Sequence, residues 1–343
     1  MIGLIDADGG NFPNLALMKI SAWHKSQGHS VKWWDAGNPL EYYDKVYISK
    51  VFSATQEPEY LPNAGEIIKG GTGYHIHFVN GKEIADEGIK EMLSPDIEHI
   101  YPDYNLYQST IDGKYKNTAF GFMSRGCPKG LIHGYCHVAA KEGLCSVEVA
   151  DLSEFWHGQK YIQLLDPNTL ACNQAIDILQ QLADSKAFVD FNQGIDIQLL
   201  TDEKLELLNK IKLKQIHFAW DNYQDKNIVV PKFEAFKAVT GMGRNKVSVY
   251  VLVNYDTTTE QDLERIYFLR GLNYQPYPMI YNKGEFFTPH GKLKPDVRKR
   301  FTNEQIDHTL ICQKIQRWCN PFIFWSCEKF EDYKPNKINN PAE

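Results

Sequence analysis

A regular alternation of short apolar runs and longer amphipathic segments, from about residue 119 to residue 280, constrains the fold more than any other feature of this chain. The runs have the length and the Val, Ile, Phe and Tyr content of buried strands, and the segments between them repeat their apolar residues at helical spacing. Strand–helix units in series place their strands side by side in a parallel sheet. The predicted strands are Phe120–Ser124, Tyr161–Asp166, Phe188–Phe191, Gln215–Trp220, Val247–Val253 and Tyr277–Tyr281.

The first third of the chain has the same rhythm on a smaller scale. Ile2–Ile5 and Val31–Trp34 are predicted strands, and between them a helix begins at Pro13 and Asn14 and ends at Gly28. Lys45–Phe52 is a third predicted strand. The sequence therefore predicts an α/β protein, with an N-terminal Rossmann-like parallel sheet followed by a partial (β/α)6 TIM-like barrel. The predicted divisions are residues 1–117, residues 118–333 and a polar tail over 334–343.

Composition narrows the classes of function. The formal net charge is −6, which argues against a broad electrostatic grip on nucleic acid. The N-terminus lacks the pattern of a signal peptide, and no window approaches the roughly 18 consecutive apolar residues of a membrane span. Seven cysteines are an odd and uneven set, unlike a secreted disulfide framework. We therefore expect a cytoplasmic protein that binds no membrane. In such a protein, clustered thiols indicate a metal site or a catalytic site.

The cysteines cluster after the first strand of the predicted barrel. Cys127 and Cys136 lie with His133 and His137 in a loop rich in glycine, and Cys145 follows nine residues after Cys136. Thiolates and imidazoles are ligands of iron–sulfur clusters and of zinc. The carboxyl ends of barrel strands are also where such folds carry their chemistry. The loop is a candidate metal site, although a surface loop with incidental Cys and His residues has the same composition.

This loop resembles the cluster loop of radical SAM enzymes. The resemblance lies in Ser124-Arg125-Gly126-Cys127-Pro128 at a strand end, in the cysteines that follow, and in the segment 138–143. It covers about residues 118–333. It implies a 4Fe-4S cluster held by three thiolates of a C-x3-C-x2-C pattern, with S-adenosyl-L-methionine on the fourth iron. Reductive cleavage of that cofactor would give a radical that abstracts hydrogen from a substrate.

The loop departs from the family pattern at the middle ligand. Leu131 stands where the second cysteine belongs, and the loop is two residues longer than the pattern. Counting back from Cys136, His133 has the spacing of the middle ligand. Histidine ligates iron in some clusters, so Cys127, His133 and Cys136 are the predicted metal ligands, with Cys145 as the alternative to His133. The alternative function is a degenerate, non-catalytic barrel that acts as a binding or accessory protein, its cluster lost or replaced by zinc.

Polar residues at later strand ends complete the predicted site. The resemblance implies contacts with the cofactor for residues that follow the second, third and fourth barrel strands, namely Asp166, Asn168, Asn192, Gln193, Asp196 and Asp221. Turn formation and helix capping would explain Asp166 and Asn168 equally well. The sequence identifies no catalytic side chain beyond these contacts.

The N-terminal unit resembles the cobalamin-binding domain that precedes some radical SAM barrels. That domain carries Asp-x-His-x-x-Gly, whereas the turn from Asp6 to Gly10 contains no histidine, so no cobalamin is predicted. The resemblance further implies a reductant protein such as flavodoxin or ferredoxin. The substrate is expected to be a small molecule or a nucleotide-type compound.

Overall fold

A computed structural model describes residues 1–9, 12–79, 82–86, 93–108, 113–129 and 136–335 of the chain. By contacts between its residues the chain divides into two compact units. The first consists of Met1–Val79 and Glu83–Val189, and the second consists of Asn80–Lys82 and Asp190–Glu343. The division predicted at residues 117 and 118 stays a prediction.

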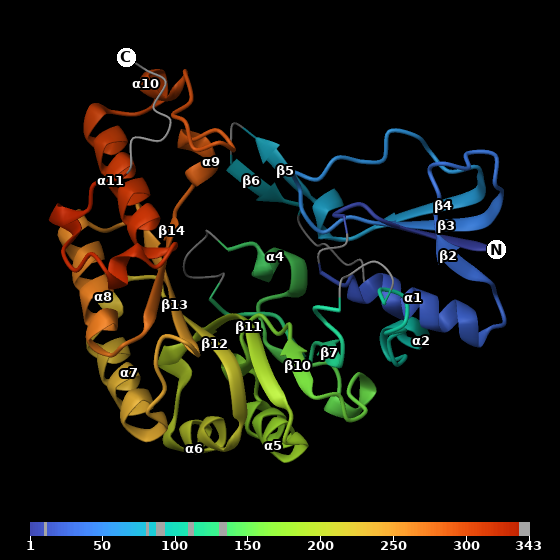
Figure 1. Cartoon of the computed structure of the whole chain (residues 1–343), viewed down its shortest axis with the longest axis horizontal. Coiled ribbons are helices and arrows are strands. Elements are labelled where there is room, and N and C mark those ends of the chain that lie inside the picture. The colour runs from blue at the N-terminus through green and yellow to red at the C-terminus, as the bar shows by residue number, and fades with distance from the viewer. Residues whose placement is uncertain (10–11, 80–81, 87–92, 109–112, 130–135, 336–343) are drawn as a thin grey trace. The chain divides into compact units, whose positions relative to one another are not determined.

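The N-terminal part of the first unit is a four-stranded sheet of order β2-β1-β3-β4 (Figure 1). Its strands run parallel, and they are β1 (Ile2–Asp6), β2 (Val31–Trp33), β3 (Tyr43–Ser49) and β4 (Ala64–Gly70). Helix α1 (Leu15–Ser26) packs Leu17, Met18 and Ile20 against Ile2 and Leu4 of β1. The parallel sheet predicted for this region is confirmed.

Helix α1 begins where the sequence places it. The Asn14 side chain accepts a hydrogen bond from the backbone N–H of Leu17 at 3.2 Å, which satisfies one of the unpaired donors of the first turn. Its amide also donates to Ser49 Oγ at the end of β3, 2.8 Å away. Asn14 therefore caps the helix and fixes it to the carboxyl end of the sheet.

The rest of the first unit leads into the predicted barrel. Its strands are β5 (Ile76–Val79), β6 (Lys82–Ala85), β7 (Thr118–Gly121), β8 (Ser124–Arg125), β9 (Val147–Glu148) and β10 (Tyr161–Leu164). Its helices are α2 (Pro95–Glu98), α4 (Val138–Glu142) and α5 (Ala175–Ser185). Strands β7 and β10 pair in parallel, while β8 and β9 form a short antiparallel ladder. That ladder closes the cysteine-bearing loop at its base.

The second unit alternates strands and helices. Its strands are β11 (Phe188–Asp196, which begins in the first unit), β12 (Lys212–Trp220), β13 (Val247–Val253) and β14 (Gln275–Ile280). Its helices are α6 (Asp202–Lys210), α7 (Lys226–Thr240), α8 (Thr259–Gly271), α9 (Lys283–Phe286), α10 (Val297–Arg300) and α11 (Asn303–Cys319). Helices α7, α8 and α11 lie beside β12, β13 and β14 (Figure 1). Strand β13 is largely buried on both faces, as is typical of a central strand of a parallel sheet.

The six predicted barrel strands form one parallel sheet of order β14-β13-β12-β11-β10-β7. Among the residues that the structure describes, no strand pairing joins β14 to β7. The parallel sheet is therefore confirmed, and its barrel form stays a prediction. No helix in the described part of the chain is long and apolar enough to cross a membrane.

Candidate functional site

Asp166 lies just beyond the carboxyl end of β10 and holds the loop that follows β7. Its carboxylate accepts hydrogen bonds from the backbone N–H groups of Met123, at 2.7 Å, and Ser124, at 2.9 Å. The Ser124 hydroxyl donates to the same carboxylate at 2.6 Å. Asp166 is 3% exposed, and burial raises its pKa to about 7, although these hydrogen bonds oppose the rise. The carboxylate therefore positions the start of the cysteine-bearing loop.

Cys127 is directed toward the next polar side chain of the same strand end. Asn168 donates from Nδ2 to Cys127 Sγ at 3.7 Å, and the two residues are 2% and 9% exposed. An amide N–H directed at a sulfur stabilises negative charge on it, and outer hydrogen bonds of this kind tune metal-bound thiolates. Two residues predicted from the sequence, Cys127 and Asn168, are thus in direct contact, and Asp166 holds the backbone before them.

Gly126 brings the backbones of Cys127 and Cys145 together. Its φ is +89°, and a Cβ at this position would lie 2.1 Å from the carbonyl oxygen of Cys145. The Cys127 N–H donates to the carbonyl of Gly143 at 3.1 Å. The β8–β9 ladder leads to this contact, since Arg125 pairs with Val147. The approach of the two cysteine-bearing segments therefore depends on a residue without a side chain.

A charged network surrounds this loop. Arg125 lies 3.8 Å from carboxylate oxygens of both Glu98 and Glu142, and its guanidinium stacks 3.8 Å from the ring centre of Phe122. Glu142 also accepts the Gly126 N–H at 3.3 Å. Arg125 and Glu142 lie within the segments that carried the family resemblance, but nothing in the sequence indicated that they meet.

The two other predicted ligands of the loop are less defined. Cys136 is exposed and lies two residues before α4. His133, like Leu131 at the position of the middle cysteine, lies outside the residues that the structure describes. Cys145 is also exposed.

The remaining predicted contacts belong to the second unit. The sequence predicted that Asn192 and Gln193 follow the strand. Strand β11 instead continues to Asp196, so both residues lie within it. The Asp196 carboxylate accepts the backbone N–H of Gln198 at 3.1 Å and so caps the short helix that follows. Asp221 follows β12, and its carbonyl accepts a hydrogen bond from Arg265 at 3.1 Å.

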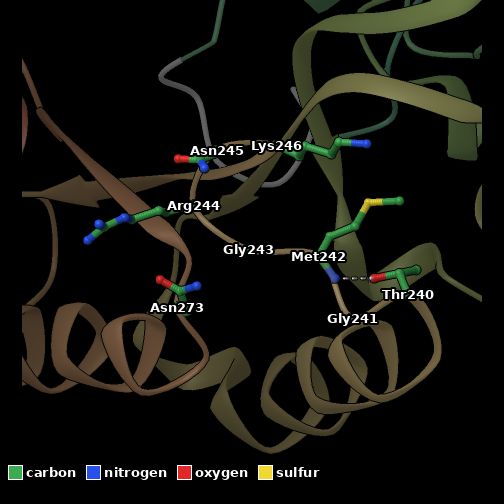
Figure 2. Close-up of a pocket in the computed structure, with 8 residues that line it drawn as sticks. All are labelled: Thr240, Gly241, Met242, Gly243, Arg244, Asn245, Lys246 and Asn273. Carbon is green, nitrogen blue, oxygen red and sulfur yellow. Dashed lines mark hydrogen bonds between the residues drawn. The ribbon is translucent and has the colours of Figure 1, made fainter.

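A cavity of about 640 Å³ lies elsewhere in the second unit (Figure 2). It is lined by Asn273 and by residues 240–246, which join α7 to β13. This position is at the amino end of β13, whereas parallel sheets bind ligands at the carboxyl ends of their strands. The cavity therefore does not coincide with any predicted site residue.

Fold and site together define an α/β protein with parallel sheets and a cysteine-bearing loop at one strand end. No family model matches the sequence, and no curated protein matches it. Among solved structures, the crystal structure of Streptococcus suis SuiB is similar over 47% of this chain, with 16% sequence identity and a TM-score of 0.29. The match covers 37% of the SuiB chain, and a likeness this slight carries no argument about function.

Proposed function

We propose that this protein is a radical SAM enzyme that holds a 4Fe-4S cluster in the loop after β7 and acts on a small-molecule or nucleotide-type substrate. The observation that supports it most is the contact between the buried Cys127 sulfur and the Asn168 amide, at the carboxyl ends of two paired parallel strands. Cluster and cofactor, when bound, would supply a 5′-deoxyadenosyl radical that removes a hydrogen atom from the substrate. A protein reductant such as flavodoxin or ferredoxin would supply the electron.

We propose Cys127, Cys136 and Cys145 as the ligands. The approach of the Gly126 and Cys145 backbones favours Cys145 over His133 as the third ligand, since it brings a second cysteine-bearing segment beside the backbone of Cys127. Three thiolates also suit iron–sulfur chemistry better than two thiolates and one imidazole. His133 remains the alternative to Cys145 as the third ligand.

The other predicted residues take supporting roles in this proposal. Asp166 is a positioning residue, because its oxygens hold the backbone of Met123 and Ser124. Asn168 stabilises charge on the Cys127 sulfur. Contacts with S-adenosyl-L-methionine are proposed for Asn192, Gln193, Asp196 and Asp221, because cofactor contacts in folds of this class gather at the carboxyl ends of the strands.

The test is anaerobic reconstitution with iron and sulfide, followed by assay of 5′-deoxyadenosine from S-adenosyl-L-methionine under a strong reductant. We expect about four iron atoms per chain, the number in one such cluster, and loss of both iron and product in C127A, C136A and C145A. H133A should keep both, and Cys327→Ala, which changes a partly exposed thiol of the second unit, is the matched control. A colourless wild-type protein that forms no 5′-deoxyadenosine contradicts the proposal.

One observation favours a second candidate, a binding or accessory protein with zinc in the same loop. Leu131 occupies the position of the middle cysteine, so the loop lacks one ligand of the family pattern. This candidate predicts about one equivalent of zinc and no iron after anaerobic purification. Leu131→Cys distinguishes the two, because a cluster that forms only in this variant indicates a site that the parent chain has lost.

A further inference from the structure

Three side chains with different metal-binding atoms meet in the second unit, between α8 and α11. Asp262 lies in the first turn of α8. His308 and Cys312 are four residues apart on α11 and so lie on one face of that helix. Their ligand atoms all lie within 4.8 Å of one another. Asp262 and Cys312 are fully buried, and His308 is partly exposed. These residues play no part in the function proposed above.

The distances suit a single tetrahedral ion. Cys312 Sγ lies 3.6 Å from His308 Nε2 and 3.8 Å from Asp262 Oδ2. Zinc bonds of about 2.3 Å to sulfur and about 2.0 Å to nitrogen or oxygen, at tetrahedral angles, separate such atoms by about 3.6 Å. The two separations that involve the Cys312 sulfur therefore match those of ligands that share one ion, and the third lies within 4.8 Å.

Neighbouring groups orient each of these three side chains. The Thr259 hydroxyl lies 3.3 Å from His308 Nδ1, so when Nδ1 donates to it, Nε2 keeps its lone pair on the side of Cys312. Thr257 donates to Asp262 Oδ1 at 2.7 Å, and Arg265 donates to the same oxygen at 2.5 Å. These two donors occupy Oδ1, while Oδ2 is the oxygen that faces the sulfur.

We propose that Asp262, His308 and Cys312 form a site for a divalent ion of the zinc class, with a fourth position open on the side of His308. A carboxylate, a thiolate and the Arg265 guanidinium together carry one negative charge, and a divalent ion changes this to one positive charge. The open position therefore favours an anionic ligand, such as hydroxide or a carboxylate. The site lies next to Asn254, directly after β13, since the Asn254 N–H is hydrogen-bonded to the Cys312 sulfur.

The competing explanation is a metal-free network in which the Cys312 thiol donates to Asp262. Metal binding by the full-length chain distinguishes the two. Serine in place of all three loop cysteines, C127S/C136S/C145S, removes the proposed cluster site, so the outcome does not depend on the proposed function. Cobalt(II) titration of this variant should give tetrahedral d–d bands with a sulfur-to-cobalt charge-transfer band, at one equivalent. Zinc should compete with cobalt and raise the thermal unfolding midpoint.

Variants within the same background assign the ligands. Cys312→Ser should abolish the charge-transfer band, while Cys319→Ser, a buried thiol seven residues further along α11, should keep it. His308→Ala should abolish one-equivalent binding, while His290→Ala, at an exposed position, should not. Thr259→Val should weaken binding by about tenfold to hundredfold, as expected for the loss of an outer hydrogen bond to a ligating histidine.

Either of two results overturns the proposal. One is the absence of stoichiometric cobalt or zinc binding by the background variant. The other is metal binding that persists unchanged in His308→Ala. This variant stays informative even if Cys312→Ser does not fold, because His308 is partly exposed and its loss should leave the core intact.

Discussion

At the scale of single residues, the chain places aspartate side chains where they fix the backbone of a loop. The Asp166 carboxylate holds Met123 and Ser124, and in the N-terminal sheet the Asp8 carboxylate holds the loop after β3 by accepting from Val51 N–H at 2.6 Å and from the Thr55 hydroxyl at 2.5 Å. Both aspartates stand just after a strand, and both bind the loop that follows a neighbouring strand. The sequence indicates such residues by their position, but it does not name the loop that each one holds.

Asp166 should make stability depend on pH. Burial raises its pKa from the ordinary value of 3.8 to about 7, so between these values the folded chain holds a proton that the unfolded chain has released. The free energy of unfolding therefore decreases as pH rises from about 4 to about 7, by up to about 1.4 kcal/mol per pH unit. Asp166→Asn removes this titration. Urea unfolding at several pH values should show the wild-type chain losing stability relative to D166N over this range, and parallel pH profiles would contradict the assignment.

Asn168 should set the electronic properties of the Cys127 sulfur. If the loop carries a cluster, Asn168→Leu removes an N–H donor to a ligating thiolate, which concentrates negative charge on the sulfur and lowers the reduction potential. Asn168→Asp replaces the donor with a second negative charge and should lower the potential further. Redox titration followed by electron paramagnetic resonance measures both, with circular dichroism to confirm folding. A potential that is equal in all three proteins would show that the amide has no such role.

At the scale of elements, the β8–β9 ladder depends on Gly126. Gly126→Ala places a Cβ against the Cys145 carbonyl and also strains a φ of +89°, so it should destabilise the chain by roughly 3 kcal/mol. Gly143→Ala is the matched control in the same loop, because its φ is +96° but a Cβ there meets nothing within 4 Å. Because only backbone strain contributes there, Gly143→Ala should cost less than Gly126→Ala does, about 1–2 kcal/mol. Urea unfolding compares the two, and equal losses would mean that the contact with Cys145 does not matter.

Arg265 joins α8 to the ends of two strands. It is fully buried, pairs with Asp262, and donates to the carbonyls of Trp220 at 2.8 Å and Leu252 at 2.7 Å. Arg265→Met leaves the Asp262 charge buried without its partner, so we expect a loss of about 3–5 kcal/mol in the free energy of unfolding. The double variant D262N/R265M removes both charges and should recover part of that loss. Stability unchanged in R265M would contradict this role for the ion pair.

The sequence predicted those elements whose apolar pattern matches their burial. Val247–Val253 is predicted and observed with the same bounds, because valine stands at every second position of a strand that is buried over most of its length. Strand β4 was missed, since its Gly, Glu and Lys residues are partly exposed and its pairing with β3 defines it. The end of β11 was missed for a related reason, because its polar Asn192 and Gln193 resemble a loop although their backbone continues the strand. The local sequence pattern of a segment does not indicate which distant segment it pairs with.

The candidate site was predictable to the same extent. Cys127, Asp166 and Asn168 were identified because polar and sulfur-bearing residues follow apolar strands at the edge where parallel strands end. The separate roles of these three residues could not be predicted, since the Asn168–Cys127 contact depends on the directions of the side chains. The cluster of Asp262, His308 and Cys312 was missed altogether, because Asp262 is distant in the sequence from the other two residues and Cys312 lies outside the loop where the cysteines gather. The four-residue spacing of His308 and Cys312, which places two ligand side chains on one face of a helix, was the available signal.

At the scale of the whole molecule, the two proposed metal sites belong to different compact units, since the cysteine-bearing loop lies within the first and α8 and α11 within the second. Sites without shared residues or contacts should lose their metals independently. Elemental analysis of protein reconstituted with iron and sulfide and then supplied with zinc should therefore give iron without bound zinc in H308A, and zinc without iron in C127S/C136S/C145S. A combined variant should hold neither metal. If H308A also lost its iron, or the triple variant its zinc, the sites would be coupled, and the assignment of one metal to each unit would be wrong.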